Sequence, residues 1–390
     1  GGYILEAGEY TISLRSDSHT VLAEEKFTVD SDIDYSKDGR SSDETVATNQ
    51  FEDYSRGDFE QLSRANGFAN YKEATAAPES LSMSKEAKKE FINNSNYNPE
   101  DYNNEEDKMP ETGAKNDIEL ADLRGVDYDD AKWDELLDNM TISDMDTVIA
   151  LGGYQTAAAS SVGKVQTIDC DGPASINNNF TGTGSIGFPS AVMIACTWND
   201  EIAMEFGESI GKMADEMGVS GWYAPAMNIH RSAFGGRNFE YYSEDPLLSG
   251  MMASAMTLGV QKVPGCGTTI KHFACNNQED NRMGSDSIVS ERALREIYLK
   301  GFEIAIKNAQ PMSIMTSYNM INGVHAANCY DICTKAARDE WGFNGTIMTD
   351  WTTTTGSTAG ECSASGCMKA GNDIVMPGDP ADHDNLRSAL

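Results

Sequence analysis

Short apolar runs alternate with longer amphipathic stretches along residues 119–390, and this alternation is the strongest constraint on the fold. Short apolar runs bounded by polar clusters are typical of buried strands, and the stretches between them have helical spacing. The expected strands are 166–170, 191–196, 221–229, 267–273, 312–318, 345–349 and 373–376. The expected helices are 199–217, 246–261, 290–308, 330–341 and 358–370. Repeated β/α units of this kind predict an α/β fold with a TIM-like (β/α) barrel over residues 119–390.

Polar side chains gather at or just after the ends of five expected strands. In a (β/α) barrel the carboxyl ends of the strands form one rim, where active sites lie. Carboxylates, cations and donors beside an aromatic ring suit a neutral ligand with many hydroxyl groups, so the pattern predicts a carbohydrate pocket. For any one residue, an ion pair that closes the rim explains the pattern about equally well. The residues are Asp171, Arg237 with Asn238, Lys271, His272, Tyr318 with Asn319, Asp350 and Trp351.

Asp350 is the candidate nucleophile, because it follows the apolar run GTIMT and precedes Trp351. A carboxylate at this position can attack an anomeric carbon and form a covalent glycosyl-enzyme, which water then releases. We expect a solvent-facing strand end, with Lys271 and Arg237 holding nearby carboxylates ionised. The alternative is that Asp350 caps a helix in the Thr-rich stretch that follows.

Glycoside hydrolysis also needs a general acid that protonates the leaving oxygen. Glu240 and Glu279 are the candidates in the expected barrel loops. Arg237 and Arg282 lie close to them in sequence and would hold both carboxylates ionised, which makes each a poor acid at neutral pH. We therefore interpret both glutamates as structural, with Glu279 the first candidate if the acid lies within this chain.

The first 118 residues have a different pattern. Residues 3–29 alternate apolar and polar side chains around a Ser-Asp-Ser-His turn, which predicts two or three antiparallel strands. Because a lone hairpin is marginal in water, we expect residues 1–30 to end a β-sandwich whose other strands precede Gly1. Residues 31–118 are rich in Asp, Ser, Asn and Lys with weak periodicity, so we expect an acidic linker or an extended surface wrap.

Composition removes several classes of function. The chain holds 62 acidic and 29 basic residues, a net charge of −33, which disfavours nucleic acids and anionic membrane surfaces as partners. No run approaches the roughly 18 apolar residues of a membrane span. Eight scattered cysteines suggest small buried hydrophobes in a reducing compartment, which favours the cytoplasm. Five separated histidines give no metal motif, and the one GxGxxG match lacks a following helix, so no metal or organic cofactor is expected.

Five segments together resemble glycoside hydrolase family 3: DGPA from Asp171, GRNFEYYSEDP from Gly236, KHFACNNQEDNR from Lys271, MTSYNMING from Met315 and MTDW from Met348. The resemblance spans about residues 120–380. It implies a retaining β-glucosidase with Asp350 as nucleophile and no cofactor. It also implies that the remaining residues bind the sugar in the first subsite. They are Asp171, Arg237, Lys271, His272, Tyr318 and Trp351.

The resemblance also bears on the substrate and on the missing parts. An Asp at position 171 is similar to the glucosidase members, whereas xylosidase members tend to carry Glu, so glucose is favoured over xylose. The chain resembles domain-permuted members, in which a fibronectin-III-like sandwich precedes the barrel and an upstream α/β sandwich domain supplies the acid/base Glu. We therefore expect a C-terminal portion of a longer protein. A β-xylosidase or broad exo-β-glycosidase, a non-catalytic sugar-binding barrel and a homo-oligomer remain open.

Overall fold

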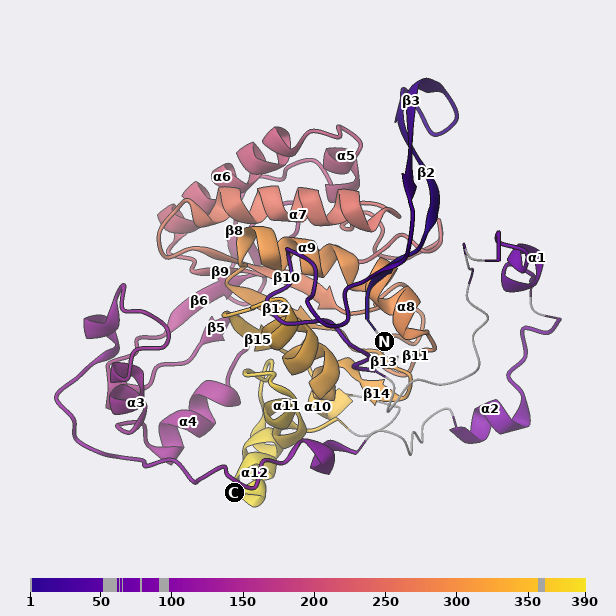
Figure 1. The fold of residues 1–390 in the computed structure, drawn as a ribbon. Helices are drawn as coiled ribbons and strands as arrows, with labels where there is room; N and C mark the ends of the chain where they lie inside the picture. The colour runs from indigo at the N-terminus through magenta and orange to yellow at the C-terminus, as the bar shows by residue number, and fades with distance from the viewer. Residues whose placement is uncertain are drawn as a thin grey trace.

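A curled sheet of mainly parallel strands forms the centre of the computed structural model, with helices packed on its outer face (Figure 1). The structure describes residues 2–51, 62, 64, 66–77, 79–90, 98–356 and 362–390. The sheet has the order β15-β12-β10-β9-β6-β5, in which β5 alone runs antiparallel to its neighbour. These strands are β5 Gln155–Thr156, β6 Thr167–Cys170, β9 Gly221–Trp222, β10 Gly267–Phe273, β12 Ser313–Thr316 and β15 Thr346–Met348.

The expected strand 373–376 joins this sheet through a single parallel bridge between Met348 and Ile374. Its other side faces the segment before β5, where the Val375 amide donates to the Ile149 carbonyl at 2.8 Å. The Gly152 amide in turn donates to the Val375 carbonyl at 3.1 Å. Backbone hydrogen bonds therefore connect both ends of the curled sheet through residues 149–152 and 374–377, which gives the strand ends one shared rim.

Long helices cover the sheet where the sequence predicts them. α7 begins after Asp245, whose side chain accepts the amide hydrogens of Leu247 and Leu248. It crosses α6 closely, because a Cβ atom at Gly207 would lie only 2.2 Å from the Met256 carbonyl oxygen. The helices of this region are α3 Lys132–Leu137, α4 Ile142–Ile149, α5 Ala191–Ala195, α6 Asp200–Met217, α7 Pro246–Gln261, α8 Glu291–Ala293, α9 Lys300–Ala309, α10 Thr353–Gly356, α11 Ala364–Ala370 and α12 Pro380–Ala389, with π-helical segments Leu294–Tyr298 and Asp331–Glu340.

The strand expected at 191–196 is wrong, because this stretch forms helix α5. Ala191, Ile194 and Ala195 are buried while Met193 is 62 % exposed, which is the i, i+3, i+4 pattern of a helix face. A six-residue apolar run is too short for its period to separate a strand from a helix. The helix expected at 358–370 begins at Ala364, and the part of that prediction at 358–361 lies outside the described residues.

Shorter strands form small separate sheets. β7 and β8 form a hairpin that contains the first three residues of the GxGxxG match at 182–187, and β11 lies beside β13, which pairs with β14. These strands are β7 Asn177–Asn178, β8 Thr183–Gly184, β11 Asp286–Ser287, β13 Met320–Ile321 and β14 Val324–His325. Among the described residues, no helix is both long and apolar enough to cross a membrane.

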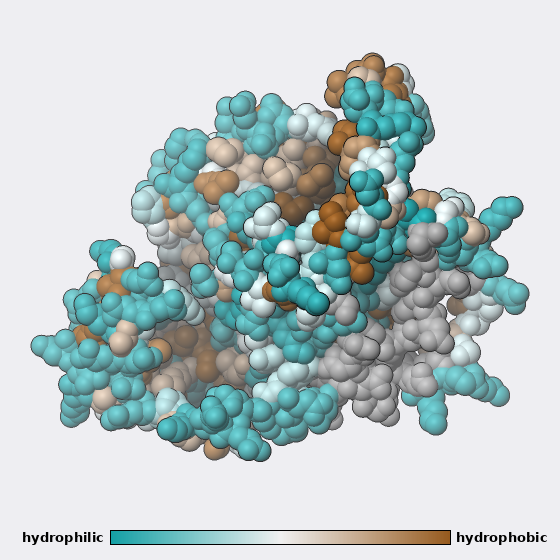
Figure 2. Space-filling model, viewed as in Figure 1, coloured by the Kyte–Doolittle hydropathy of each residue, from teal (hydrophilic) through white to brown (hydrophobic). Residues whose placement is uncertain are grey.

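The N-terminal residues form an antiparallel hairpin that projects from the body (Figure 1). It consists of β2 Gly8–Arg15 and β3 Val21–Val29, as the alternating pattern predicts, and short strands β1 Ile4–Leu5 and β4 Ile33–Asp34 pair at its base. In Figure 2 brown hydrophobic residues are exposed on the projecting hairpin among teal hydrophilic ones. Two short helices follow at α1 Tyr71–Ala74 and α2 Lys85–Glu90.

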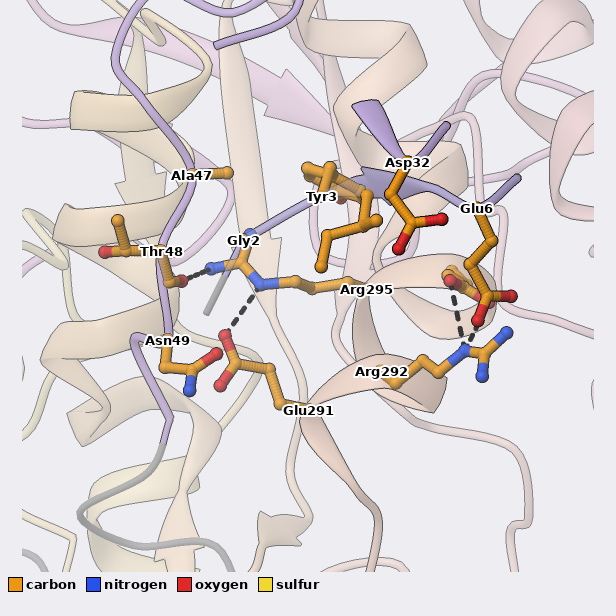
Figure 3. Close-up of a pocket in the computed structure, with 12 residues that line it drawn as sticks. Gly2, Tyr3, Glu6, Asp32, Ala47, Thr48, Asn49, Glu291, Arg292 and Arg295 are labelled. Atoms are coloured by element: carbon orange, nitrogen blue, oxygen red, sulfur yellow. Dashed lines mark hydrogen bonds and ion pairs between the residues drawn. The ribbon is translucent and has the colours of Figure 1, made fainter. Parts of the chain in front are cut away.

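Residues 40–51 lie against the barrel. Phe51 is fully buried in the main hydrophobic core, and Arg40 forms an ion pair of 2.7 Å with Glu303 of α9. A cavity of about 360 Å³ separates the N-terminal strands from α8 (Figure 3). At its floor Arg295 donates to the Thr48 carbonyl and to Glu291, each at 2.9 Å. This part of the expected linker is therefore a surface wrap held by charge pairs and by one aromatic anchor.

Candidate active site

Seven of the nine rim residues predicted from the sequence line one cavity of about 320 Å³, whereas Asn238 and Asn319 are not among its lining residues. The cavity lies at the carboxyl ends of the parallel strands, where β6 leads to Asp171, β10 ends at Phe273 and β15 leads to Asp350. Five further residues complete the lining. They are Tyr154, Tyr223, Arg282, Met315 and Met376.

Strand β10 contributes two neighbouring residues to this cavity. Side chains normally alternate between the two faces of a strand, so consecutive residues point apart. The pairing of β10 with β12 shifts register between Lys271 and Phe273, and such an irregularity re-aims a side chain. Lys271 and His272 therefore both face the cavity while each is only 2 % exposed. Alternation alone would have placed one of the two on the far side of the sheet.

Asp350 projects its carboxylate into the cavity. Its Oδ1 accepts the Trp351 amide hydrogen at 2.7 Å, and its Oδ2 lies 3.6 Å from His272 Nε2. Oδ2 is buried and has no hydrogen-bond partner among the described residues. The capping alternative gains no support, because the Thr353 amide at the start of α10 donates to the Asp350 carbonyl and not to its side chain. A buried oxygen without a donor is available to a reacting carbon.

The two carboxylates of the cavity have opposite electrostatic environments. Burial raises the pKa of Asp350, and the Trp351 amide and the charges of Arg237 and Lys271 offset this only in part. Burial acts in the same direction on Asp171, but the Lys271 ammonium 2.7 Å away holds the pKa of Asp171 below its ordinary value. Lys271 and Arg237 therefore lower the pKa of Asp350 as expected, but burial outweighs them and leaves this pKa above its ordinary value.

The expected solvent-facing position of Asp350 is wrong, because the residue is buried. The residue is only 8 % exposed, at the bottom of the cavity. Lys271 pairs with Asp171, and Arg237 pairs with Glu240. Each of these cations already has a carboxylate partner, so their attraction does not offset the loss of hydration at Asp350.

Both glutamates that we interpret as structural are paired with arginines. Glu240 is 4 % exposed and binds Arg237, and Glu279 accepts hydrogen bonds from Arg282 at 2.7 Å and from Asn276 at 3.0 Å. Asp171 and Asp350 are the only carboxylates among the described residues that line the cavity. Asp171 is held ionised by Lys271, so this lining supplies a nucleophile without an evident general acid.

Aromatic side chains from loops form one wall of the site. Trp351 stacks on Phe180 with ring centroids 5.6 Å apart, and Tyr154 meets both rings edge-on. Arg282 lies over the Tyr318 ring at 4.5 Å. Sequence reasoning assigned no site role to Tyr154, Phe180 or Arg282, because each lies outside the strand ends. The hydrophobic Phe180, 73 % exposed on the β7–β8 hairpin, is the kind of signal that could have revealed this wall.

Six of the eight cysteines are buried, as expected for small core residues. In the described part of the chain, no group of three or more His, Cys, Asp or Glu side chains is arranged to hold a metal ion.

A barrel rim that brings two carboxylates together with cations and aromatic rings is typical of a carbohydrate-processing class of protein. Residues 168–389 match the model of the glycosyl hydrolase family 3 N-terminal domain, and the chain belongs to this family. A β-glucosidase A from Butyrivibrio fibrisolvens is 47 % identical over 200 residues, which are 51 % of this chain and 24 % of that protein.

Two solved structures extend the comparison. β-Glucosidase 3B from Thermotoga neapolitana, in complex with α-D-glucose, is 39 % identical with a TM-score of 0.61, over 66 % of this chain and 39 % of that one. A β-glucosidase from Paenibacillus barengoltzii is 29 % identical with a TM-score of 0.72, over 99 % of this chain and 41 % of that one. The chain thus spans less than half the length of each of these relatives.

Proposed function

We propose that the chain is the barrel-bearing portion of a retaining exo-β-glucosidase, which removes terminal non-reducing β-D-glucosyl residues. The observation that carries this proposal is the position of Asp350 Oδ2, which is buried in the cavity without a well-formed hydrogen bond and lies beside His272 and Tyr318. An oxygen in this environment can form a bond to the anomeric carbon as the bond to the leaving oxygen breaks. Water then attacks the same carbon and releases glucose and the free carboxylate.

The remaining predicted residues have the chemistry to hold the sugar. Asp171 paired with Lys271 presents a carboxylate and an ammonium to neighbouring hydroxyl groups, and charged groups make the stronger hydrogen bonds to such ligands. Trp351, stacked on Phe180, offers an apolar face. In this proposal Arg237, His272 and Tyr318 complete the sugar-binding wall opposite that face.

The acid that protonates the leaving oxygen belongs, in this proposal, to an upstream α/β sandwich domain of the same protein. Support comes from the pairing of Glu240 and Glu279 with arginines, which leaves the described cavity lining without an acid. The domain-permuted arrangement is supported by the Paenibacillus structure, whose alignment takes in the N-terminal 118 residues as well as the barrel.

The hairpin supports a fibronectin-III-like sandwich before the barrel. Its register places Tyr10, Ile12 and Leu14 on one face, opposite Phe27, Glu25 and Ala23. Ile12 is 66 % exposed and Leu14 is 65 % exposed, whereas the other face carries the Glu9–Lys26 ion pair. An apolar sheet face normally packs on a second sheet.

Trapping with a 2-deoxy-2-fluoro β-glucoside tests the nucleophile and the enzyme class together. We expect a covalent adduct on the peptide that contains Asp350, identified by mass spectrometry of the digested protein. A label on another carboxylate would overturn the assignment, and a bound but unlabelled protein would favour a non-catalytic sugar-binding barrel. Comparing rates on aryl β-glucoside and aryl β-xyloside separates the glucosidase from the β-xylosidase or broad exo-β-glycosidase alternative.

A further inference from the structure

A chain of buried polar contacts extends outward from the histidine beside Asp350. His272 Nδ1 lies 3.1 Å from the Tyr241 hydroxyl, which lies 3.0 Å from Asn276 Nδ2. The same Nδ2 lies 3.0 Å from Glu279 Oε1, and Arg282 binds Glu279 Oε2 at 2.7 Å. Tyr241, His272 and Asn276 are each 2 % exposed, so their hydrogens must be shared among these partners.

The charge at the outer end fixes the direction of every hydrogen bond. Glu279 forms an ion pair with the Arg282 guanidinium, and a carboxylate in such a pair accepts hydrogen bonds but donates none. Asn276 must therefore turn its NH₂ group toward Glu279, and its second amide hydrogen then points to the Tyr241 oxygen. Because this oxygen accepts from Asn276, the one hydroxyl hydrogen of Tyr241 is donated to His272 Nδ1.

His272 is neutral in this environment. Burial, reinforced by the positive charges of Arg237, Lys271 and Arg282, lowers the pKa of His272 well below its ordinary value. A neutral imidazole has one hydrogen, and Nδ1 accepts from Tyr241, so the hydrogen is on Nε2.

We propose that Tyr241 is a positioning residue, which together with Asn276, Glu279 and Arg282 holds His272 as the Nε2–H tautomer with its hydrogen facing Asp350. The opposite tautomer would place the Nε2 lone pair 3.6 Å from the Asp350 carboxylate, an unfavourable contact. It would also leave the buried Tyr241 hydroxyl hydrogen without an acceptor among these contacts. Tyr241, Asn276, Glu279 and Arg282 thus determine which nitrogen of His272 carries the hydrogen.

Nitrogen NMR of histidine-labelled protein tests the tautomer directly. The chain has only five histidines, and His272→Gln identifies the signal of His272 by its loss. We expect the Nε2–H pattern in the parent protein and a mixture of tautomers in Tyr241→Phe. A parent Nδ1–H pattern, or an unchanged pattern in Tyr241→Phe, would overturn the proposal.

The neighbouring Tyr242 provides a matched control. It is equally buried, and its hydroxyl donates to the Met256 sulfur at 3.2 Å, away from His272. Tyr242→Phe removes the same hydroxyl group from the next residue, so we expect an unchanged His272 pattern. An equal change in both variants would mean that the loss of any buried hydroxyl disturbs the barrel, which contradicts a specific role for Tyr241.

Reversing the donor chain is the sharper test. Asn276→Asp replaces the amide donor by an acceptor, so the Tyr241 hydroxyl turns toward the new carboxyl group and its oxygen faces Nδ1. We expect the His272 hydrogen to move to Nδ1 in folded protein, as judged by circular dichroism. Retention of the Nε2–H pattern in the folded variant would contradict the donor order. If this variant does not fold, Tyr241→Phe alone decides.

A kinetic measurement rests on the proposed glucosidase function. In the protein that includes its upstream domains, we expect Tyr241→Phe to lower kcat/KM about tenfold to a hundredfold, the loss typical of removing one orienting partner. Tyr242→Phe should leave kcat/KM within about twofold. The NMR measurement needs no turnover, so an inactive parent protein would count against the proposed function while the tautomer result still decides the role of Tyr241. A tautomer change without loss of rate would show that the orientation of His272 does not matter for hydrolysis.

Discussion

The rim cavity and the N-terminal hairpin differ in how completely their side chains are paired or packed. In the cavity Lys271, Arg237 and Arg282 each bind a carboxylate, and Asp350 Oδ2 is the notable polar atom left over. Along the hairpin, by contrast, Ile12, Leu14 and Phe27 on one face are exposed. The difference indicates two kinds of surface: the cavity presents a single unpaired carboxylate oxygen, whereas the hairpin presents exposed apolar side chains. The predictions below test that division, in order of decreasing effect.

The largest effect should come from Asp350. In the protein with its upstream domains, we expect Asp350→Ala and Asp350→Asn to reduce kcat by about 10⁴-fold or more, as loss of a nucleophile does. Asp350→Asn keeps the shape of the side chain and removes a buried charge, so thermal unfolding should show no loss of stability. Ordinary turnover by the Asn variant would mean that the vacant oxygen is not the reacting group.

The proposed location of the acid on an upstream domain predicts a dependence on the leaving group. The 390-residue chain alone should hydrolyse a phenyl β-glucoside about 10²- to 10⁴-fold more slowly than the protein with its upstream domains, because leaving-group protonation contributes that much. A dinitrophenyl β-glucoside needs little protonation, so its rate should differ much less between the two proteins. Equal rates on the phenyl substrate would place the acid within this chain, with Glu279 the first residue to substitute.

The exposed hairpin face predicts that stability depends on context. We expect Ile12→Ser to cost about 1.5 to 3 kcal/mol of unfolding free energy in the protein with its upstream domains, where the side chain is buried. In the 390-residue chain the same change should cost under about 0.5 kcal/mol. Thr11→Ser, on the opposite face, is the control. Equal costs of Ile12→Ser in urea unfolding of both proteins would show that nothing covers this face.

The smallest effect is a displacement of the pH profile. Because burial raises the pKa of Asp350 above that of an ordinary aspartate, its reactive ionised form is lost at a higher pH as the solution is acidified. We therefore expect inactivation by 2-deoxy-2-fluoroglucosyl fluoride, which needs little acid assistance, to decline below a midpoint higher than 3.8. A midpoint at or below that value would mean that the neighbouring cations dominate over burial.

Strand-end residues were predictable from the sequence because a parallel sheet collects its carboxyl ends at one rim. Asp171, Lys271, Tyr318 and Asp350 come from four separate strands, yet all face one cavity. The resemblance to glycoside hydrolase family 3 predicted the same residues, and membership of that family is confirmed. Their individual roles in binding and catalysis stay predictions.

Other features of the site carry no periodic signal in the sequence. Phe180 and Arg282 reach the site from loops, whose path no alternation of apolar residues describes. The register shift in β10 is a property of its pairing with β12 and is not evident from the run of residues around Lys271. The pKa of Asp350 is raised because the side chain is buried and the nearby cations pair with other carboxylates. Both facts depend on three-dimensional geometry.

The burial of Phe51 means that the cooperative folding unit begins before the predicted barrel boundary. Because this ring, 68 residues before the predicted barrel boundary at residue 119, lies in the main hydrophobic core, a protein cut at residue 119 would lose a core side chain and open a void. A shortened version meant to fold and bind sugar alone should retain residues 40–51, either in place or supplied as a separate peptide. Residues 40–51, which the composition alone would assign to a dispensable linker, are therefore a structural component of the barrel.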